Sequence, residues 1–309
     1  MKRFEQNFWL DSTLILGREK IADHGEDAWV YDVGEDRVMV GAFDGLGGSG
    51  AKRYEAYDGR TGAYIASRAA ADAADEWLRG GELSEESLHR SICEELRAYK
   101  TGAGTPGGAV IKGSMTREFP TTVSVAVCRP AADGVTADFY WAGDSRGYIL
   151  DENGLKQITR DDVNDADDIL AQMDSDGVMN NLASLSKAWT LHRTRREHIP
   201  AGIAFTATDG CFGYVRTPME FEYQLLETMC AAECVDDWQN RLEDTLRECA
   251  GDDFTLLGVI FGYGEFSAMQ RRFRPRLEWL RKTYIEPLET AAPAEINAMW
   301  LNYSRSYYA

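Results

Sequence analysis

The sequence lacks long apolar runs. No stretch approaches the ~18 apolar residues that a membrane-spanning helix requires. The first residues include Glu5 and Asp11, whereas a signal peptide needs a continuous apolar segment. These absences argue against a membrane protein and against secretion, and they predict a soluble, cytoplasmic protein with no membrane partner.

Basic residues are scarce relative to acidic ones. The chain has 33 Lys and Arg against 51 Asp and Glu, which gives a formal net charge of −18. A protein with this charge repels phosphate backbones instead of condensing onto them. We therefore expect no nucleic-acid partner.

Histidine is also scarce, and the cysteines do not form pairs. The chain has four histidines and six cysteines, and the cysteines show no spacing typical of zinc ligands. We interpret all six as reduced core residues: Cys93, Cys128, Cys211, Cys230, Cys234 and Cys249.

Apolar residues make up 44% of the chain, which is enough for a sizeable core. Segments rich in Val, Ile, Phe, Tyr and Trp predict strands at 38–43, 121–128, 137–142, 203–208 and 254–261. Helices are predicted over 61–78, from Ser84, from Thr217 and over 236–249. Because paired helices separate groups of strands, the order favours a layered α+β fold over a doubly wound parallel sheet.

The end of the chain has a different pattern. After about Tyr263, apolar residues recur at helical spacing, and Pro275 is expected to kink this helix or to start a new one. We therefore predict a catalytic domain over 1–263 and a C-terminal helical extension over 264–309.

Aspartates follow three predicted strands directly, in Asp44-Gly45, Gly143-Asp144 and Asp209-Gly210, and Asp252 precedes the last strand. A strand end fixes the backbone of a short acidic side chain, and carboxylate oxygens are the ligands that magnesium and manganese prefer. Any single Asp-Gly is explained more simply as turn chemistry, but three strand-end aspartates weaken that explanation. Together they predict a pair of metal ions held by Asp44, Asp209 and Asp252.

The same segments, in the same order, match a set of short motifs. They are Gly25-Glu26-Asp27-Ala28, Asp44-Gly45-Leu46-Gly47-Gly48, Thr121-Thr122, Gly143-Asp144-Ser145-Arg146, Ile158-Thr159-Arg160-Asp161-Asp162, Thr208-Asp209-Gly210 and Asp252-Asp253-Phe254-Thr255. The set resembles the metal-dependent protein serine/threonine phosphatase family, type 2C (PPM), in its bacterial form. The resemblance spans roughly residues 17 to 262.

The resemblance implies a four-layer α-β-β-α sandwich, in which helices flank two antiparallel sheets. It also implies a hydrolase of the signalling type, a protein phosphatase that removes phosphate from serine and threonine by means of a metal-activated water. Its substrates would be phosphorylated proteins, and a cognate serine/threonine kinase system is the partner that such substrates imply. The implied cofactors are two magnesium or manganese ions, with a third, weaker one.

Site residues follow from the resemblance motif by motif. Asp44 would bridge two metals, the Gly45 carbonyl would ligate one, and Asp209 and Asp252 would complete the set. Glu26 would bind one metal directly or through water. Asp144 would share the third metal with Asp209, so that the implied catalytic residues are Asp44, Asp209 and Asp144. Asp253 is interpreted as a neighbour of the site.

Two positions depart from the family pattern. Leu46 stands where a histidine is usual, and Ala22 stands where an arginine usually contacts phosphate. The phosphate-binding residue is therefore open, with Lys20, Arg18 and His24 as candidates. These departures keep two alternatives open, a phosphatase-like binding module without turnover and a phosphatase of small phosphate esters.

Residues 165–200 correspond to a variable flap in relatives and match no pattern, so specificity is expected there. This region includes a basic cluster, Arg193, Arg195 and Arg196, and a second cluster follows at 271–276. We interpret both as solvated or salt-bridged surface, with a docking patch as the alternative.

Overall fold

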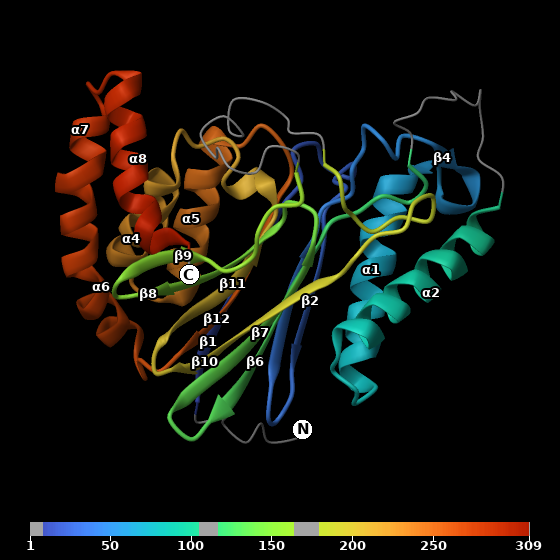
Figure 1. Ribbon diagram of the computed structural model, residues 1–309, viewed down its shortest axis with the longest axis horizontal. Helices are drawn as coiled ribbons and strands as arrows, with labels where there is room; N and C mark the ends of the chain where they lie inside the picture. Colours follow the sequence, from blue (N-terminus) through green and yellow to red (C-terminus); the bar gives the residue numbers. More distant parts are fainter. Residues whose placement is uncertain (1–8, 105–116, 164–178, 309) are drawn as a thin grey trace.

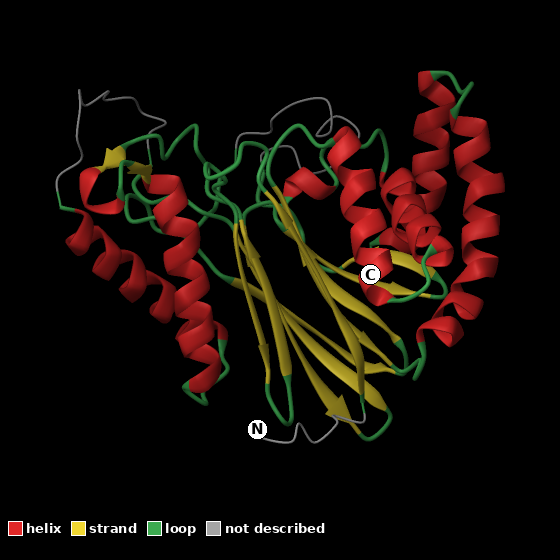
Figure 2. Cartoon of the chain, turned by 180° about the vertical axis from the view of Figure 1, so that it is seen from behind, coloured by secondary structure: helices red, strands yellow, loops and turns green. Residues whose placement is uncertain are grey.

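A computed structural model describes residues 9–104, 117–163 and 179–308 and contains two antiparallel sheets that face each other (Figures 1 and 2). Sheet A has the order β1 (Leu10–Arg18), β12 (Phe254–Phe261), β11 (Gly202–Ala207), β8 (Arg146–Asp151) and β9 (Gly154–Gln157). Sheet B has the order β10 (His192–Ile199), β7 (Gly134–Ala142), β6 (Val123–Ala131), β3 (Val38–Phe43) and β2 (Ala28–Val33). A short ribbon pairs β4 (Arg53–Tyr54) with β5 (Arg60–Thr61).

Helices cover the outer face of each sheet, as Figure 2 shows. On sheet B lie α1 (Gly62–Arg79) and α2 (Glu85–Ala103). On sheet A lie α4 (Pro218–Ala231), α5 (Val235–Cys249), α6 (Phe266–Leu280), α7 (Glu286–Leu288) and α8 (Pro293–Tyr307), with a π-helical turn at Arg281–Ile285. The predicted four-layer α-β-β-α sandwich is confirmed.

Local sequence signals explain where the helices begin. The Thr61 hydroxyl accepts a hydrogen bond from the backbone N–H of Tyr64, which caps α1. Ser84 forms a capping box with Ser87 at the start of α2. Thr217 caps α4, and Pro218 occupies its first turn, where its missing N–H costs nothing.

Three apolar layers hold the sandwich together. Residues such as Val40, Phe139 and Val259 are buried between the two sheets. The outer face of sheet B packs on the alanine-rich α1 and on α2. The outer face of sheet A packs on the C-terminal helices, including the fully buried Tyr303 and Tyr307 of α8. Burial on this scale is the main source of stability in a domain of this size.

The helices after Tyr263 also make buried polar contacts with the rest of the fold. Arg276 of α6 forms a bidentate ion pair with Glu222 of α4, which also accepts a 2.5 Å hydrogen bond from the Tyr303 hydroxyl. Helix α6 continues through Pro275, so a new helix does not start there. Pro275 and Arg271, four residues earlier, are both exposed, so water can satisfy the carbonyl that loses its helical partner. The boundary between 1–263 and 264–309 stays a prediction.

Two further features of the fold bear on the sequence analysis. Cys128 and Cys211 are buried, as predicted, but Cys234 is exposed because it lies in the short connection between α4 and α5. Within the described residues, no helix combines the length and apolarity that crossing a membrane requires.

Candidate active site

Asp44 lies where β3 ends, and two threonines fix its backbone. Its N–H donates to the Thr122 hydroxyl at 2.9 Å, and its carbonyl accepts from the Thr122 N–H at 2.8 Å and from the Thr121 hydroxyl at 2.9 Å. The Thr122 hydroxyl also lies 2.6 Å from that of Ser145, beside Asp144. These bonds tie the end of β3 to the start of β6 and to the connection between β7 and β8, and they fix the backbone of Asp44.

Gly45 allows the chain to turn closely around the segment that carries Glu26. A Cβ on Gly45 would lie 2.5 Å from the carbonyl oxygen of Ala63 and 2.8 Å from that of Glu26, which is closer than side chains tolerate. Only glycine therefore fits between α1 and the 25–27 segment. This explains why the residue after Asp44 lacks a side chain.

Glu26 is held on three sides. Its carboxylate accepts a hydrogen bond from the Thr61 hydroxyl, its carbonyl accepts from Ser67 at 2.5 Å, and its N–H donates to the Asp253 carboxylate at 2.7 Å. Burial raises the pKa of Glu26, and the nearby Asp253 and Asp252 raise it further. Asp253 thus positions the backbone of this segment, as expected for a neighbour of the site.

Asp27 faces the end of β11. Its carboxylate accepts a 2.8 Å hydrogen bond from the Thr208 hydroxyl, and Thr208 precedes Asp209. Burial raises the pKa of Asp27 to about 7, and repulsion from Asp209 and Asp253 adds to the effect although hydrogen bonds from Thr208 and Thr255 oppose it. Asp27 therefore belongs to the same acidic group as Asp209.

The strand-end aspartates meet around Asp44. Burial raises the pKa of Asp44 well above its ordinary value, and four neighbouring carboxylates raise it further: Asp209, Asp27, Asp144 and Asp252. Repulsion of this kind acts over short distances, so acidic residues from 27 to 252 share one end of the sandwich. We call these five residues the acidic cluster: Asp27, Asp44, Asp144, Asp209 and Asp252. Asp252 is exposed at its rim, and its carboxylate accepts a hydrogen bond from the N–H of Asp253.

Asp144 has little compensation for its charge. Its Oδ1 atom is buried and has no hydrogen-bond partner among the described residues. Burial raises the pKa of Asp144 well above its ordinary value, with Asp209 and Asp161 adding to the effect. Arg146, two residues away, lowers the pKa of Asp144 but offsets its charge only in part, because its guanidinium is paired with Asp161 in a bidentate contact of 2.6 to 3.1 Å.

Arg146 also connects the acidic end of the sandwich to the C-terminal helix. Its guanidinium lies 4.0 Å from the ring centroid of Phe212, whose N–H donates to the Asp209 carbonyl. Its Nη1 atom lies 3.4 Å from the Tyr148 hydroxyl. Tyr148 is in turn hydrogen-bonded to Tyr307 of α8. Helix α8 therefore buttresses the strand that carries Arg146.

The acidic cluster fits divalent cations by its chemistry, although its side chains do not form a closed ligand set. Within the residues described, no three carboxylate, imidazole or thiolate groups are grouped closely enough to hold an ion. However, carboxylates buried against each other and an unpartnered Asp144 oxygen are costly without a cation. Magnesium keeps several waters and needs few side chains, which suits this arrangement.

The three candidates for phosphate binding all have partners within the protein. Arg18 pairs with Glu243 at 3.0 Å, Lys20 donates to the Gly251 carbonyl, and the His24 ring lies 3.0 Å from the carbonyl oxygen of Ala22. A different basic side chain, Arg53, lowers the pKa of Glu26. The phosphate-binding residue stays open.

Sequence reasoning missed Asp27, the supporting role of Thr122, and Arg146. Asp27 adjoins Glu26 in the same motif and precedes β2, so the alternation of strand side chains was a signal that one of the two acids faces inward. Thr122 and Arg146 lie in the recognised motifs but act through contacts 78 and 15 residues away, which periodicity does not reveal.

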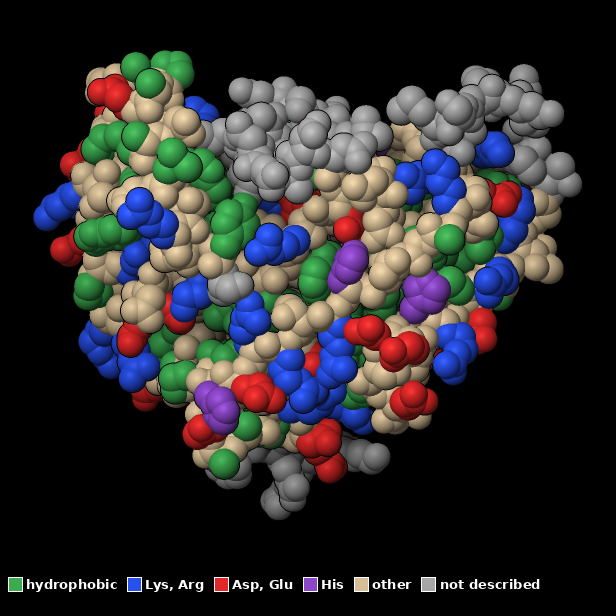
Figure 3. All heavy atoms as spheres, viewed as in Figure 1, with side chains coloured by type: hydrophobic (Ala, Val, Ile, Leu, Met, Phe, Trp, Pro, Cys, Tyr) green, Lys and Arg blue, Asp and Glu red, His purple; other side chains and the backbone are tan. Residues whose placement is uncertain are grey.

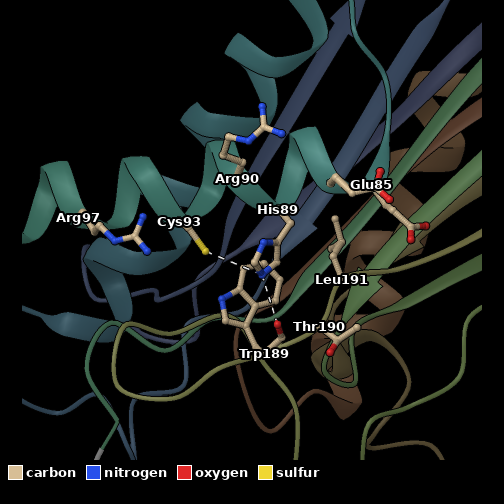
Figure 4. A pocket seen from close by; sticks show the side chains of 9 residues that line it. Glu85, His89, Arg90, Cys93, Arg97, Trp189, Thr190 and Leu191 are labelled. Carbon is tan, nitrogen blue, oxygen red and sulfur yellow. Dashed lines mark hydrogen bonds between the residues drawn. The ribbon is translucent and has the colours of Figure 1, made fainter.

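A separate groove of about 490 Å³ lies between α2 and residues 189–191 (Figure 4). His89 packs against Trp189 with ring centroids 4.2 Å apart and ring planes tilted by 44°, and Cys93 Sγ lies 3.9 Å from His89 Nε2. None of the acidic residues around Asp44 lines this groove, so it is distinct from the acidic cluster.

Comparisons with known proteins agree with the fold. The sequence profile of the protein phosphatase 2C family matches residues 18–247. No curated protein matches the chain. Among solved structures, serine/threonine phosphatase Stp1 from Staphylococcus aureus is similar with a TM-score of 0.60 and 14% identity, over 84% of this chain and 99% of that one.

Two more structures are similar at low identity. The catalytic domain of the serine threonine protein phosphatase PstP, in complex with two manganese ions, has a TM-score of 0.53 and 15% identity, over 81% of this chain and 97% of that one. The phosphatase MsPP from Mycobacterium smegmatis, in complex with cacodylate, has a TM-score of 0.55 and 12% identity, over 82% and 100%. At these identities the structures show a shared fold.

Proposed function

The chain belongs to the protein phosphatase 2C family, and we propose that it hydrolyses phosphoserine and phosphothreonine on other proteins with the help of magnesium or manganese. The observation that carries this proposal is the group of carboxylates around Asp44, whose mutual repulsion calls for cations. A site that gathers negative charge can accept a dianionic phosphate only when metal ions reverse its charge.

The proposed ligands are those that the motifs indicate. Asp44, the Gly45 carbonyl, Asp209, Asp252 and Glu26 would hold two ions. Asp144, with its unpartnered Oδ1, would hold a third ion together with Asp209. When bound, the ions supply activation of the attacking water and neutralisation of the phosphate charge.

The chain's own residues contribute orientation. The threonine bonds fix the backbone of Asp44, so little reorganisation of this segment is needed when charge develops on the phosphate. Asp253 holds the segment that carries Glu26, and Thr208 holds Asp27 beside Asp209. Leu46 offers no proton at the position where a histidine is usual, so the leaving oxygen has to take its proton from elsewhere.

We also propose a signalling role, a cellular location and a domain organisation for the enzyme. Phosphoprotein substrates place the enzyme opposite a serine/threonine kinase system in signalling, and a cytoplasmic location is consistent with reduced cysteines. The proposed catalytic domain spans 1–263, and the extension over 264–309 supports it through α6 and α8.

The test is a turnover assay of p-nitrophenyl phosphate and phosphothreonine peptides with manganese, with magnesium, and with a chelator. We expect turnover with either metal and its loss on chelation. Turnover that survives chelation, or no turnover with either metal, would contradict the proposal. Phosphopeptide binding without hydrolysis would support the binding-module alternative, and a higher kcat/KM on metabolites than on peptides would support the small-ester alternative.

A further inference from the structure

A cluster of three arginines surrounds one buried carboxylate in sheet B. Asp138 of β7 is fully buried and accepts five hydrogen bonds of 2.7 to 3.2 Å from Arg129 of β6 and from Arg193 and Arg195 of β10. Strand register explains the convergence, because Arg195 pairs directly with Asp138 and Arg193 with Tyr140, one of the next residues on the same face. We call Arg129, Arg193 and Arg195 the arginine cluster.

The arginine cluster has more positive charge than Asp138 can neutralise. One bidentate arginine is enough to satisfy a carboxylate. Three guanidiniums carry fifteen N–H donors in total, and five of them reach Asp138. Their side chains are 25%, 29% and 44% exposed for Arg129, Arg193 and Arg195. Arg195 also lies 3.8 Å from the exposed Glu197, so three guanidiniums face two carboxylates and one positive charge is left over. In a chain with a net charge of −18, this surface therefore holds fixed cations that are partly exposed to solvent.

The arginine cluster also lies on a route that leads to the acidic cluster. Basic side chains gather over the lower part of the face in Figure 3, where β6, β7 and β10 run. Asp138 is four residues before the end of β7, roughly 14 Å along the strand from the turn that leads to Asp144. Strand β10 is an edge of sheet B, and no described strand pairs with its outer side. It lies in the region 165–200, where specificity was expected.

We propose that the arginine cluster docks a carboxylate-rich segment of the phosphoprotein substrate, about four to six residues from the phosphorylated side chain. This rests on the proposed phosphatase function. Asp138 holds the guanidiniums in place, so little side-chain entropy is lost when a ligand carboxylate binds them. An extended segment of this length covers the distance along β7. The cluster acts on substrate binding and takes no part in the chemical step.

The experiment compares two phosphothreonine peptides that differ only in residues four to six on both sides of the phosphothreonine, glutamate in one and glutamine in the other. For the wild-type protein with manganese, we expect KM for the acidic peptide to be about tenfold lower, with similar kcat, because two charge-assisted contacts are gained. In the double variant Arg193→Gln with Arg195→Gln, the two KM values should become equal. Turnover of p-nitrophenyl phosphate should not change.

The matched control is Arg241→Gln. Arg241 also pairs with an aspartate, Asp237, and its side chain is 46% exposed, close to the 44% of Arg195. This control should keep the preference for the acidic peptide. If the double variant does not fold, Arg195→Gln alone and a salt titration of the wild-type protein serve instead, because screening should remove the preference.

A binding measurement separates this proposal from the proposed function. Fluorescence anisotropy of the labelled acidic and neutral peptides without phosphate, in chelator, reports docking alone. Tighter binding of the acidic peptide that is lost in the double variant supports docking, even if no peptide or p-nitrophenyl phosphate is hydrolysed, which would count against the phosphatase function only. Equal binding of both peptides, or a preference that survives in the double variant, would overturn the docking proposal.

Discussion

Asp44, which follows β3, and Asp138 of β7 are two aspartates in opposite electrostatic surroundings. Burial and four carboxylates have the largest effects on Asp44, so its pKa lies well above the ordinary value. Burial also raises the pKa of Asp138, but hydrogen bonds from Arg195, Arg193 and Arg129 outweigh it and hold the pKa below the ordinary value.

The opposite pKa shifts of Asp44 and Asp138 indicate different roles for the two carboxylates. The protein supplies the hydrogen-bond partners of the Asp138 carboxylate from its own side chains, which is how a structural buried charge is stabilised. It leaves the acidic cluster around Asp44 uncompensated, at a cost to stability that a structural role would not justify. The proposed metal ions would supply positive charge at Asp44, whereas at Asp138 the protein's own arginines supply it.

The largest expected effect is the loss of turnover when Asp44 is changed. Asp44→Asn or Asp209→Asn should lower kcat by at least ~100-fold, because removing a metal ligand removes the activation of water. In chelator, Asp44→Asn should unfold at the same temperature as the wild-type protein or higher, since it removes a repelling charge. Wild-type turnover in both variants would refute the assignment of the site.

Metal binding itself should stabilise the acidic cluster. At a concentration about 100 times Kd, manganese or magnesium should raise the free energy of unfolding by about 2.7 kcal/mol. Thermal denaturation with and without metal measures this, and Asp44→Asn should abolish most of the gain. The Asp138→Asn variant is the control and should keep it. A gain of equal size in both variants would place the metals elsewhere.

Asp138→Asn should lower the free energy of unfolding by about 1 to 2 kcal/mol at pH 7, because three partly exposed arginines lose their shared anion. The folded-state pKa of Asp138 is depressed, so its contribution is present above the unfolded value of about 4 and is lost as the pH falls through the folded-state pKa. The difference between variant and wild type should therefore shrink towards pH 3. Denaturant melts at pH 7 and pH 3 test this, and a constant difference would contradict it.

The smallest expected effect concerns the contact of Tyr307 in α8 with Tyr148 in β8, the strand that carries Arg146. Tyr307→Phe removes one buried hydroxyl that is hydrogen-bonded to Tyr148, and should lower the free energy of unfolding by about 1 kcal/mol. Tyr308→Phe, at the exposed neighbouring tyrosine, is the control and should change it by less than about 0.5 kcal/mol. Equal effects in urea denaturation would mean that the Tyr307 hydroxyl does not support the strand.

Much of the fold could be predicted from local patterns. Strands β3 and β12 have the predicted bounds because their apolar runs end in Asp-Gly and begin after Asp-Asp. Strand β10 was missed because its sequence, from His192 to Ile199, is mostly charged. It is a strand because Asp138 on β7 pairs with its arginines, a tertiary contact that sequence periodicity does not contain.

The candidate site was predicted in part for a similar reason. Strand ends at Asp44, Asp144 and Asp209 were visible in the sequence, and the structure places these residues in one electrostatic group. Glu26 was predicted as a metal ligand and Asp27 was not. A motif fixes the position of a pair of acidic residues in the chain, but it does not show which of the two side chains points into the site. The direction of each side chain depends on Thr61 and Thr208, which belong to other elements.

The pairing of β1 with β12 has a consequence for biosynthesis. Leu10 lies opposite Phe261, so sheet A joins the first described strand to a strand that leaves the ribosome much later. Sheet B uses strands between residues 28 and 199 and can assemble earlier. The nascent chain therefore carries β1 without its partner strand until β12 has been synthesised, and a chaperone that binds exposed apolar segments would protect the chain most during that time.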